Sequence, residues 1–184
     1  MHGLTTERLT IRRFTPDDLA GVAELLDGCF GDEPLKERER WLDWTVRNYV
    51  ALEALHQPPF GDYAVVCGAR LVGSIGLVPS LAPFGRLPTL GGDPSANHTP
   101  ELGLFWATHP EHRRRGYATE AAAAALRFVF GQLHAARVVA TTEHDNVASM
   151  AVMRKLGMTI DRNPINDPPW FQTVGVVFTD QPSG

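Results

Sequence analysis

The feature that most constrains the fold is a strand, a basic turn and a helix that follow one another between residues 101 and 133. Glu101–Thr108 is mostly apolar, which is typical of a strand buried on both faces. In Ala118–Leu133 the apolar residues recur at the i, i+3, i+4, i+7 spacing of one helical face. The turn between them carries three consecutive arginines and a glycine. A buried strand that leads into an amphipathic helix predicts a mixed α/β domain.

The remaining segments also alternate between strands and helices. Strands are expected at Leu9–Phe14, Tyr63–Cys67, Leu71–Val78, Arg137–Thr142 and Phe171–Thr179, with the second and third paired as a hairpin. Helices are expected from a Thr15 cap to about Leu26, over Glu33–Leu55 as one amphipathic helix or a helix pair, and from Asp145 or Asn146 through Leu156, where Gly157 stops the helix. Pro79–Pro100 is rich in proline and glycine and is expected to be a long loop.

Composition limits the class of protein. A chain of 184 residues with 43% hydrophobic and 21% charged residues fits one soluble domain, residues 1–184. No run approaches the roughly 20 apolar residues of a membrane span, and the N-terminus is not a secretory signal, so a cytoplasmic location is expected. The net charge of −4 argues against a nucleic-acid partner. Cys29 and Cys67 lack metal-site spacing, the histidines are scattered, and no metal is expected.

The turn before the second helix has the properties of an anion site. A strand that enters a helix through a tight turn leaves backbone N–H groups unpaired, and these groups attract anionic oxygens together with the helix dipole. Gly116 allows backbone conformations and close approaches that a β-carbon would obstruct, and Ala118 keeps the next turn open. Arg113, Arg114 and Arg115 add positive potential that suits a polyanionic cofactor. The alternative is an exposed arginine run that happens to precede a helix.

Three segments carry a family resemblance. Arg113-x-x-Gly116-x-Ala118 resembles the Gln/Arg-x-x-Gly-x-Gly/Ala signature of the GNAT superfamily of acetyl-CoA-dependent N-acetyltransferases. The string from Arg115 to Ala121 is similar to its RimJ/RimL-like branch, which acts on ribosomal-protein N-termini. Thr6–Arg12 resembles the first strand of that branch, and Asn146-x-x-Ser149 with Lys155–Met158 resembles its last helix. The resemblance covers Thr6 to about Ile160 and implies the GNAT fold, an α/β domain of the α+β type with a mixed, mostly antiparallel, splayed sheet flanked by helices.

The resemblance also implies a co-substrate, acetyl-CoA, and the residues that hold coenzyme A. Backbone N–H groups from about Arg114 to Thr119 would hold the diphosphate, and arginine side chains would meet the outer phosphates. The strand edge at Trp106 to Thr108 would pair with the amides of the pantetheine arm. Asn146 would hydrogen-bond the pantetheine or the far end of the cofactor, and Ser149 would lie near the sulfur. The implied coenzyme A-binding residues are Trp106, Ala107, Thr108, Arg113, Arg114, Arg115, Gly116, Tyr117, Ala118, Thr119, Asn146 and Ser149.

Ser149 and Glu101 are the candidate catalytic residues. Many family members protonate the departing thiolate with a tyrosine on the last helix, but residues 147–156 contain none, so Ser149 is the expected substitute. Its alternative role is local capping with Asn146. The branch often has a glutamate on this strand, at the position that Gly103 occupies here. Glu101 lies two residues earlier, which moves its carboxylate about 6.6 Å along the strand and favours proton transfer from the amine through a water molecule. Glu101 could also be a solvated strand start, and His144 is a second candidate base.

These observations predict an N-acetyltransferase that moves an acetyl group directly from acetyl-CoA to a primary amine. The amine belongs to a protein N-terminus or a small molecule, and Glu33–Leu55 with Pro79–Pro100 are expected to form the acceptor side. The alternative is a catalytically silent sensor or interaction module that binds acyl-CoA on the same fold. Neither nucleic acid nor membrane is an expected partner. Edge strands in such sheets commonly form dimers, so a homodimer is also considered.

Overall fold

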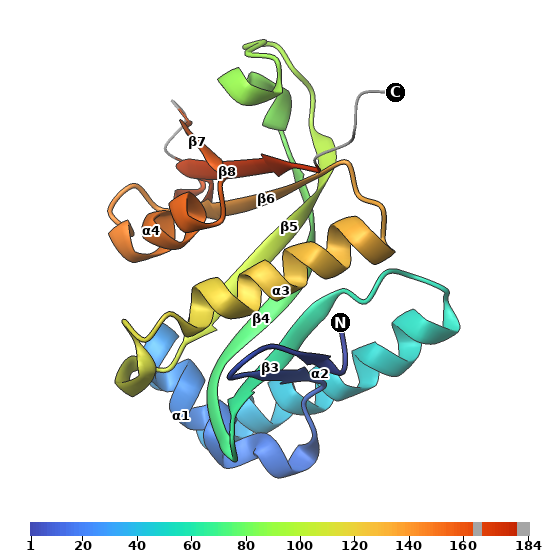
Figure 1. Cartoon of the computed structure of the whole chain (residues 1–184), viewed down its shortest axis with the longest axis vertical. Helices are drawn as coiled ribbons and strands as arrows, with labels where there is room; N and C mark the ends of the chain where they lie inside the picture. Colours follow the sequence, from blue (N-terminus) through green and yellow to red (C-terminus); the bar gives the residue numbers. More distant parts are fainter. Residues whose placement is uncertain (164–166, 180–184) are drawn as a thin grey trace. The chain divides into compact units, whose positions relative to one another are not determined.

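The structure, a computed structural model, describes residues 1–163 and 167–179. These ranges contain four α-helices and eight strands, joined in part by short 3₁₀ turns (Figure 1). The helices are α1 (Leu19–Phe30), α2 (Leu35–Ala54), α3 (Tyr117–Gln132) and α4 (Val147–Lys155). The strands are β1 (Leu4–Thr5), β2 (Thr10–Arg12), β3 (Gly61–Cys67), β4 (Arg70–Ala82), β5 (Thr99–Thr108), β6 (Arg137–Thr142), β7 (Thr159–Arg162) and β8 (Thr173–Phe178).

The strands form one sheet in the order β1-β2-β3-β4-β5-β6-β8-β7. The pairs β1–β2, β2–β3, β3–β4, β6–β8 and β7–β8 are antiparallel. β5 and β6 are parallel and pair where Gly103 lies opposite Val139. This mixed, mostly antiparallel sheet with four helices confirms the predicted fold class.

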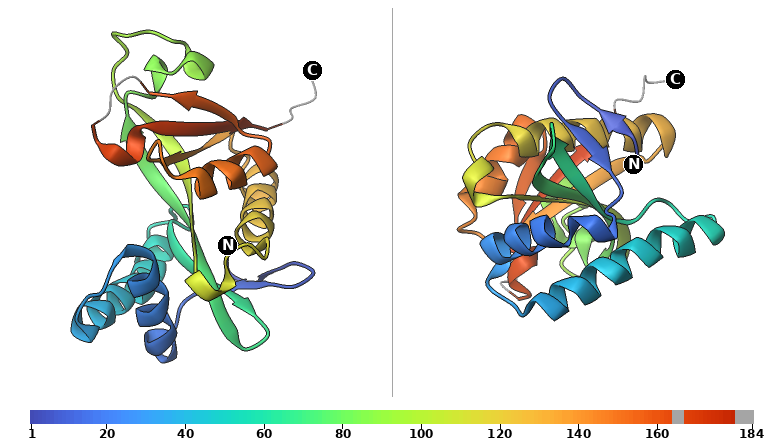
Figure 2. Two further views of the ribbon diagram at one scale, coloured as in Figure 1. Left: turned by 90° about the vertical axis from the view of Figure 1, so that its left-hand side faces the viewer. Right: turned by 90° about the horizontal axis from the view of Figure 1, so that it is seen from below.

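The chain divides into two compact units. The first contains Met1–Leu77 and Phe105–Phe128, and the second contains Val78–Leu104 and the described residues from Val129 onward. In the first unit, α1 and α2 lie side by side (Figure 2) and pack on β3. The core there consists of Phe14, Val22, Leu26, Leu42, Ala64 and Val66.

The N-terminal part of the first unit follows its local sequence signals. Thr15 caps a 3₁₀ turn at Pro16–Asp18, and the Thr15 N–H donates to Asp18 Oδ2 at 2.8 Å. This turn runs directly into α1, as the Thr15-Pro16 pattern predicts. Glu33–Leu55 was expected to be one helix or two, and it forms the single helix α2. The hairpin of β3 and β4 is confirmed, with its turn at Gly68, which has a φ of 61°.

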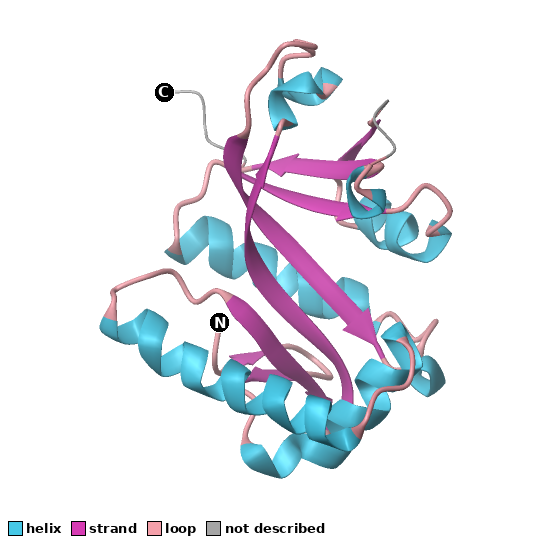
Figure 3. Ribbon diagram, turned by 180° about the vertical axis from the view of Figure 1, so that it is seen from behind, coloured by secondary structure: helices cyan, strands magenta, loops and turns pink. Residues whose placement is uncertain are grey.

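The second unit contains the largest departure from the sequence prediction. Pro79–Pro100 was expected to be a loop, but β4 continues to Ala82 and 3₁₀ turns follow at Phe84–Arg86 and Pro88–Leu90. Phe84 and Leu87 are fully buried. They pack with residues of β6 and β8, which run beside each other (Figure 3). The predicted loop is therefore shorter at both ends, because β4 runs to Ala82 and β5 begins at Thr99, and the residues between them form compact turns around buried apolar side chains.

The other elements of the second unit are close to their predicted bounds. β6 spans Arg137–Thr142 as predicted, and β8 covers most of the predicted last strand. β7 was not predicted, since Thr159–Arg162 is only four residues long and includes two charges. In the described ranges, no helix is long and apolar enough to cross a membrane.

Candidate active site

The predicted strand, turn and helix are present at the centre of the sequence. β5 ends at Thr108, a 3₁₀ turn spans Pro110–His112, and α3 begins at Tyr117. His109 caps the 3₁₀ turn, because its Nδ1 accepts a hydrogen bond from the Glu111 N–H at 3.3 Å. The segment from Phe105 to Phe128 lies within the first unit, so the turn and the start of α3 form one local site.

The backbone of the turn is left-handed at two positions. Arg114 has a φ of 62° and Gly116 a φ of 82°. Among the residues that the structure describes, the N–H groups of Arg114, Arg115 and Gly116 have no hydrogen-bond acceptor, and all three residues are exposed. The Gly116 carbonyl accepts from the Glu120 N–H at 3.0 Å, so Gly116 caps α3 and the free N–H groups of the first helical turn follow directly. Such a run of backbone donors is suited to an anion with several oxygens.

The three arginine side chains of the turn differ in their surroundings. Arg113 Nη2 donates to the Gly28 carbonyl at 3.2 Å, and Arg113 Nε donates to the Thr108 carbonyl at 3.4 Å, so Arg113 ties the turn to α1. Arg114 and Arg115 are exposed, and within residues 1–163 and 167–179 their side chains have no hydrogen-bond or ion-pair partner. Two of the three guanidinium groups are therefore free to meet an anion.

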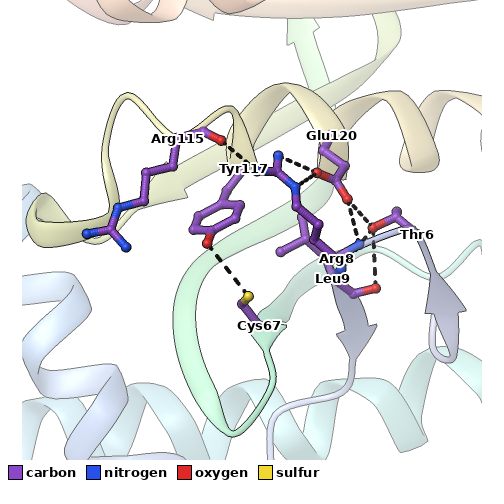
Figure 4. Close-up of polar contacts among 7 residues, drawn as sticks. All are labelled: Thr6, Arg8, Leu9, Cys67, Arg115, Tyr117 and Glu120. Atoms are coloured by element: carbon purple, nitrogen blue, oxygen red, sulfur yellow. Dashed lines mark hydrogen bonds and ion pairs between the residues drawn. The ribbon is translucent and has the colours of Figure 1, made fainter.

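Residues from the N-terminal hairpin contact this turn. The Arg8 Nη1 donates to the Arg115 carbonyl at 3.1 Å, and the Arg8 Nε donates to Glu120 Oε2 at 2.7 Å (Figure 4). The Thr6 hydroxyl and the Arg8 N–H donate to the other oxygen of Glu120. Burial by itself would raise the pKa of Glu120, but the hydrogen bonds from Thr6 and Arg8 outweigh it and hold that pKa below its ordinary value. Both segments carry family motifs, but nothing in the sequence indicated that they are in contact.

The end of β5 borders a small cavity. The cavity measures about 10 Å³, enough for roughly one water molecule, and Trp106, Ala107 and Thr108 contribute to its wall. Ser74 on β4 also lines it, and the buried Ser74 Oγ has no hydrogen-bond partner among the described residues. The Thr108 carbonyl, at the predicted pantetheine edge, accepts a hydrogen bond from Cys29 Sγ at 3.4 Å as well as the one from Arg113. Ser74 gave no signal in the sequence.

His112 is a further buried polar residue of this segment. Its ring lies beside that of Tyr117, with centroids 6.4 Å apart, and its Nδ1 has no partner in the described chain. Burial lowers the pKa of His112, and the positive charge of Arg115 acts in the same direction. Both effects favour the neutral form of the His112 ring.

Glu101, the candidate base, lies in the second unit and has a partner that the sequence did not indicate. Arg137 Nε donates to Glu101 Oε2 at 2.7 Å, and Arg137 Nη2 donates to Glu101 Oε1. Glu101 is 8% exposed, so it is a buried ion-pair member and not a solvated strand start. Its role as a base stays a prediction, and both of its oxygens already accept hydrogen bonds.

Asn146, Ser149 and His144 also belong to the second unit. The Asn146 Oδ1 accepts a hydrogen bond from the Ser149 N–H at 3.0 Å, so the predicted capping of α4 is present. The Ser149 hydroxyl has no hydrogen-bond partner in residues 1–163 and 167–179. His144 Nδ1 lies 3.0 Å from the Thr173 hydroxyl, which orients the ring. The roles assigned to these three residues stay predictions.

Comparison with protein families and curated proteins agrees with this geometry. A family model described as an acetyltransferase (GNAT) domain matches residues 8–159. The chain is 41% identical over 61 residues to the uncharacterized N-acetyltransferase YnaD of Bacillus subtilis (strain 168), which is 33% of this chain and 35% of that protein. It is 34% identical over 79 residues to the uncharacterized N-acetyltransferase YjdG of the same strain, 43% of this chain and 46% of that protein. The chain thus matches less than half the length of either relative.

Solved structures share the fold over nearly the whole chain. An acetyltransferase of the GNAT family from Bacillus anthracis aligns with a TM-score of 0.66 at 20% identity, covering 97% of this chain and 99% of that one. RimL, a ribosomal L7/L12 alpha-N-protein acetyltransferase solved with coenzyme A, aligns with a TM-score of 0.65 at 12% identity, covering 96% of each chain. Because the GNAT model matches most of the sequence, the chain belongs to the GNAT acetyltransferase family.

Proposed function

We propose that this protein transfers an acetyl group from acetyl-CoA directly to a primary amine, with the diphosphate of coenzyme A held by the turn before α3. Family membership supports acetyl transfer to an amine. The single observation that carries the proposal is the set of exposed N–H groups at Arg114, Arg115 and Gly116 that have no acceptor in the described chain. RimL, which shares the fold, was solved with coenzyme A.

The residues present fit coenzyme A. A diphosphate offers several oxygens close together, and the left-handed turn offers successive backbone donors followed by a helix N-terminus. In the proposal, the Arg114 and Arg115 guanidinium groups pair with the outer phosphates, while Arg113 holds the turn against α1. Trp106, Ala107 and Thr108 offer the strand edge to the pantetheine amides. Asn146 and Ser149 are assigned to the pantetheine and the sulfur.

Acetyl-CoA supplies an acetyl group as a thioester. The protein must position an amine and stabilise two negative charges, one on the carbonyl oxygen and one on the departing thiolate. The amine nitrogen forms a bond to the carbonyl carbon while the carbon–sulfur bond breaks. A backbone N–H near Trp106 to Thr108 is the proposed donor to the oxygen that becomes negative. The Ser149 hydroxyl, free of protein partners in the described ranges, is proposed to give or orient the proton that the thiolate needs. The proton lost by the amine passes to a base.

The proposed base is Glu101, His144 or a water molecule. Glu101 must accept the proton despite its ion pair with Arg137. His144 can accept it at Nε2 when its Nδ1 carries a hydrogen that is donated to Thr173. Glu101→Gln or His144→Gln should lower kcat by about 100-fold if the replaced residue is the base. If both variants keep kcat within about threefold of the parent, water is the acceptor.

The acceptor amine sets how strong this base has to be. Freeing an α-amino group at pH 7 costs about 1 kcal/mol, whereas freeing a lysine costs about 4.6 kcal/mol. A weak base is sufficient for an α-amino group but not for a lysine. We therefore favour a protein N-terminus or a small amine of low pKa as the acceptor, in keeping with the proposed RimJ/RimL-like branch. RimL is by its name an acetyltransferase of a ribosomal-protein α-amino group.

The test measures release of free thiol from acetyl-CoA with a panel of N-terminal peptides, polyamines and aminoglycosides, alongside calorimetric titration with coenzyme A. Saturable binding together with turnover on one class of amine supports the proposal. Saturable binding without turnover on any amine supports the second candidate, an acyl-CoA-binding sensor. The engagement of both Glu101 oxygens by Arg137 is the observation that favours this second candidate. No binding of coenzyme A would overturn both.

A further inference from the structure

The N-terminal hairpin and the start of α3 meet in one polar cluster, formed by Thr6, Arg8, Arg115 and Glu120 (Figure 4). Arg8 and Glu120 are 112 residues apart in the sequence. The Arg8 guanidinium also lies over the Tyr117 ring, with its central carbon 4.9 Å from the ring centroid. A single side chain thus contacts the last residue of the arginine run and the first turn of α3.

The contact with Arg115 fixes the direction of a peptide group. In a trans peptide, the carbonyl of one residue and the N–H of the next point in opposite directions. The Arg115 carbonyl accepts from Arg8 Nη1 at 3.1 Å. The Gly116 N–H of the same peptide group therefore points away from Arg8, and it has no acceptor among the described residues. Arg8 holds one of the donors in the orientation that leaves it open to a ligand.

Glu120 in turn fixes Arg8. Its carboxylate accepts hydrogen bonds from Arg8 Nε, the Arg8 N–H and the Thr6 hydroxyl, and Arg8 Nη2 forms an ion pair with it. The contacts from Nε and Nη2 use one edge of the Arg8 head group and leave Nη1 aimed at the Arg115 carbonyl. Because Glu120 compensates the charge of Arg8, the guanidinium acts on the turn mainly through geometry.

We propose that Arg8 is a positioning residue for coenzyme A: anchored by Glu120, it holds the Arg115–Gly116 peptide so that the Gly116 N–H faces the diphosphate, without touching the cofactor itself. This inference rests on the proposed function of the turn. It also gives a physical reason why two segments that are distant in the chain, Thr6–Arg12 and Arg115–Ala121, both resemble motifs of the same branch.

The experiment compares the parent with Arg8→Gln and Arg8→Lys. Calorimetry measures the Kd of coenzyme A, and kinetics measure kcat/KM for acetyl-CoA and for S-acetylpantetheine, which lacks the diphosphate. We expect both variants to raise the Kd of coenzyme A and lower kcat/KM for acetyl-CoA about tenfold, with kcat/KM for S-acetylpantetheine unchanged. Lysine keeps the charge, but its single nitrogen cannot reach Glu120 and the Arg115 carbonyl together as the guanidinium does. Full rescue by lysine would overturn the geometric role.

Arg12→Gln is the matched control. Arg12 lies in the same hairpin and pairs through both Nη atoms with Asp18, each at 2.7 Å, away from the turn. It should lower the melting temperature while leaving the Kd of coenzyme A at the parent value. If Arg8→Gln behaves like Arg12→Gln, with a stability loss and no change in affinity, Arg8 is only structural and the inference fails.

A spectroscopic readout separates this inference from the proposed function. In the ligand-free protein, the Gly116 amide resonance should shift in Arg8→Gln and stay in place in Arg12→Gln, because the peptide is released only in the first. If the Gly116 resonance shifts in Arg8→Gln but the parent binds no coenzyme A, the proposed function is wrong, and so is the role of Arg8 in cofactor binding. Coenzyme A binding by the parent with an unmoved Gly116 resonance in Arg8→Gln would sink the inference alone.

Discussion

Asp62 shows how one side chain can set the pH dependence of stability. It lies on β3 opposite Gly76, where a β-carbon would be 2.5 Å from Asp62 Oδ1, so the glycine leaves room for the carboxylate. Burial raises the pKa of Asp62 to about 6 from its ordinary value of 3.8. Between these two values the folded state binds more protons than the unfolded state. The free energy of unfolding therefore falls as the pH rises through this window.

Asp62→Asn should remove that loss of stability. At pH 7 we expect the variant to be more stable than the parent by up to about 3 kcal/mol, and near pH 3 the two should be equal, because Asp62 is then protonated in both states. Urea titrations between pH 3 and pH 8 measure the difference. Asp43→Asn, at an exposed position of α2, should change stability by less than about 0.5 kcal/mol at any of these pH values. A variant that is less stable than the parent at pH 7 would contradict the assignment.

At the scale of elements, the turn between β5 and α3 depends on a conformation that favours glycine. Gly116 has a φ of 82°, and a β-carbon there would lie 3.4 Å from Arg8 Nη2. A β-carbon at Gly116 would therefore strain the backbone and press on Arg8, and both effects would move the peptide whose N–H is proposed to bind the diphosphate. The conformation of this turn is thus expected to affect the affinity for coenzyme A.

Gly116→Ala should lower stability by about 1–2 kcal/mol and raise the Kd of coenzyme A about tenfold, since the left-handed backbone disfavours a β-carbon and the donors move. Thermal melts and calorimetric titration measure the two effects. Gly68→Ala is the control, because Gly68 has a φ of 61° in the β3–β4 turn and open space around its β-carbon position. It should lose comparable stability with no change in Kd. An unchanged Kd for Gly116→Ala would count against the diphosphate site.

At the scale of the whole molecule, the two units are tied together by the chain itself. The chain passes from one unit to the other after Leu77, after Leu104 and after Phe128, and these points fall within β4, β5 and α3. Neither unit is a continuous segment. Because β4, β5 and α3 each continue from one unit into the other, we expect the two units to unfold together as a single cooperative domain.

Phe84→Ala tests this cooperativity. Phe84 is fully buried in the second unit and packs edge-on against Phe171, so the variant should lose about 3–5 kcal/mol. We expect one thermal transition in the parent and one in the variant, shifted to lower temperature, with equal calorimetric and van't Hoff enthalpies. In a Trp170→Phe background, which leaves Trp41, Trp44 and Trp106 of the first unit, tryptophan fluorescence should follow the same shift. Two separate transitions would show that the units unfold independently.

Much of the fold could be predicted from the sequence because its signals act over a few residues. The helical period of Ala118–Leu133 and the β-branched run Arg137–Thr142 correspond to α3 and β6. The capping oxygen of Asn146 and the left-handed Gly157, with a φ of 74°, bound α4 as predicted. Family membership, too, followed from short motifs. The short β7 was missed because four residues are too few for a period to emerge.

By itself, the sequence determined where most helices and strands form, that a strand enters a helix through a basic turn, and to which family the chain belongs. Only the tertiary structure decided which partner each charge has. Arg137 reaches Glu101 across 36 positions, Arg8 reaches Glu120 across 112, and Arg113 turns toward α1. Local patterns reflect hydrogen bonds and sterics between near neighbours along the chain, whereas these pairings depend on which distant segments packing of the core brings within a few ångströms.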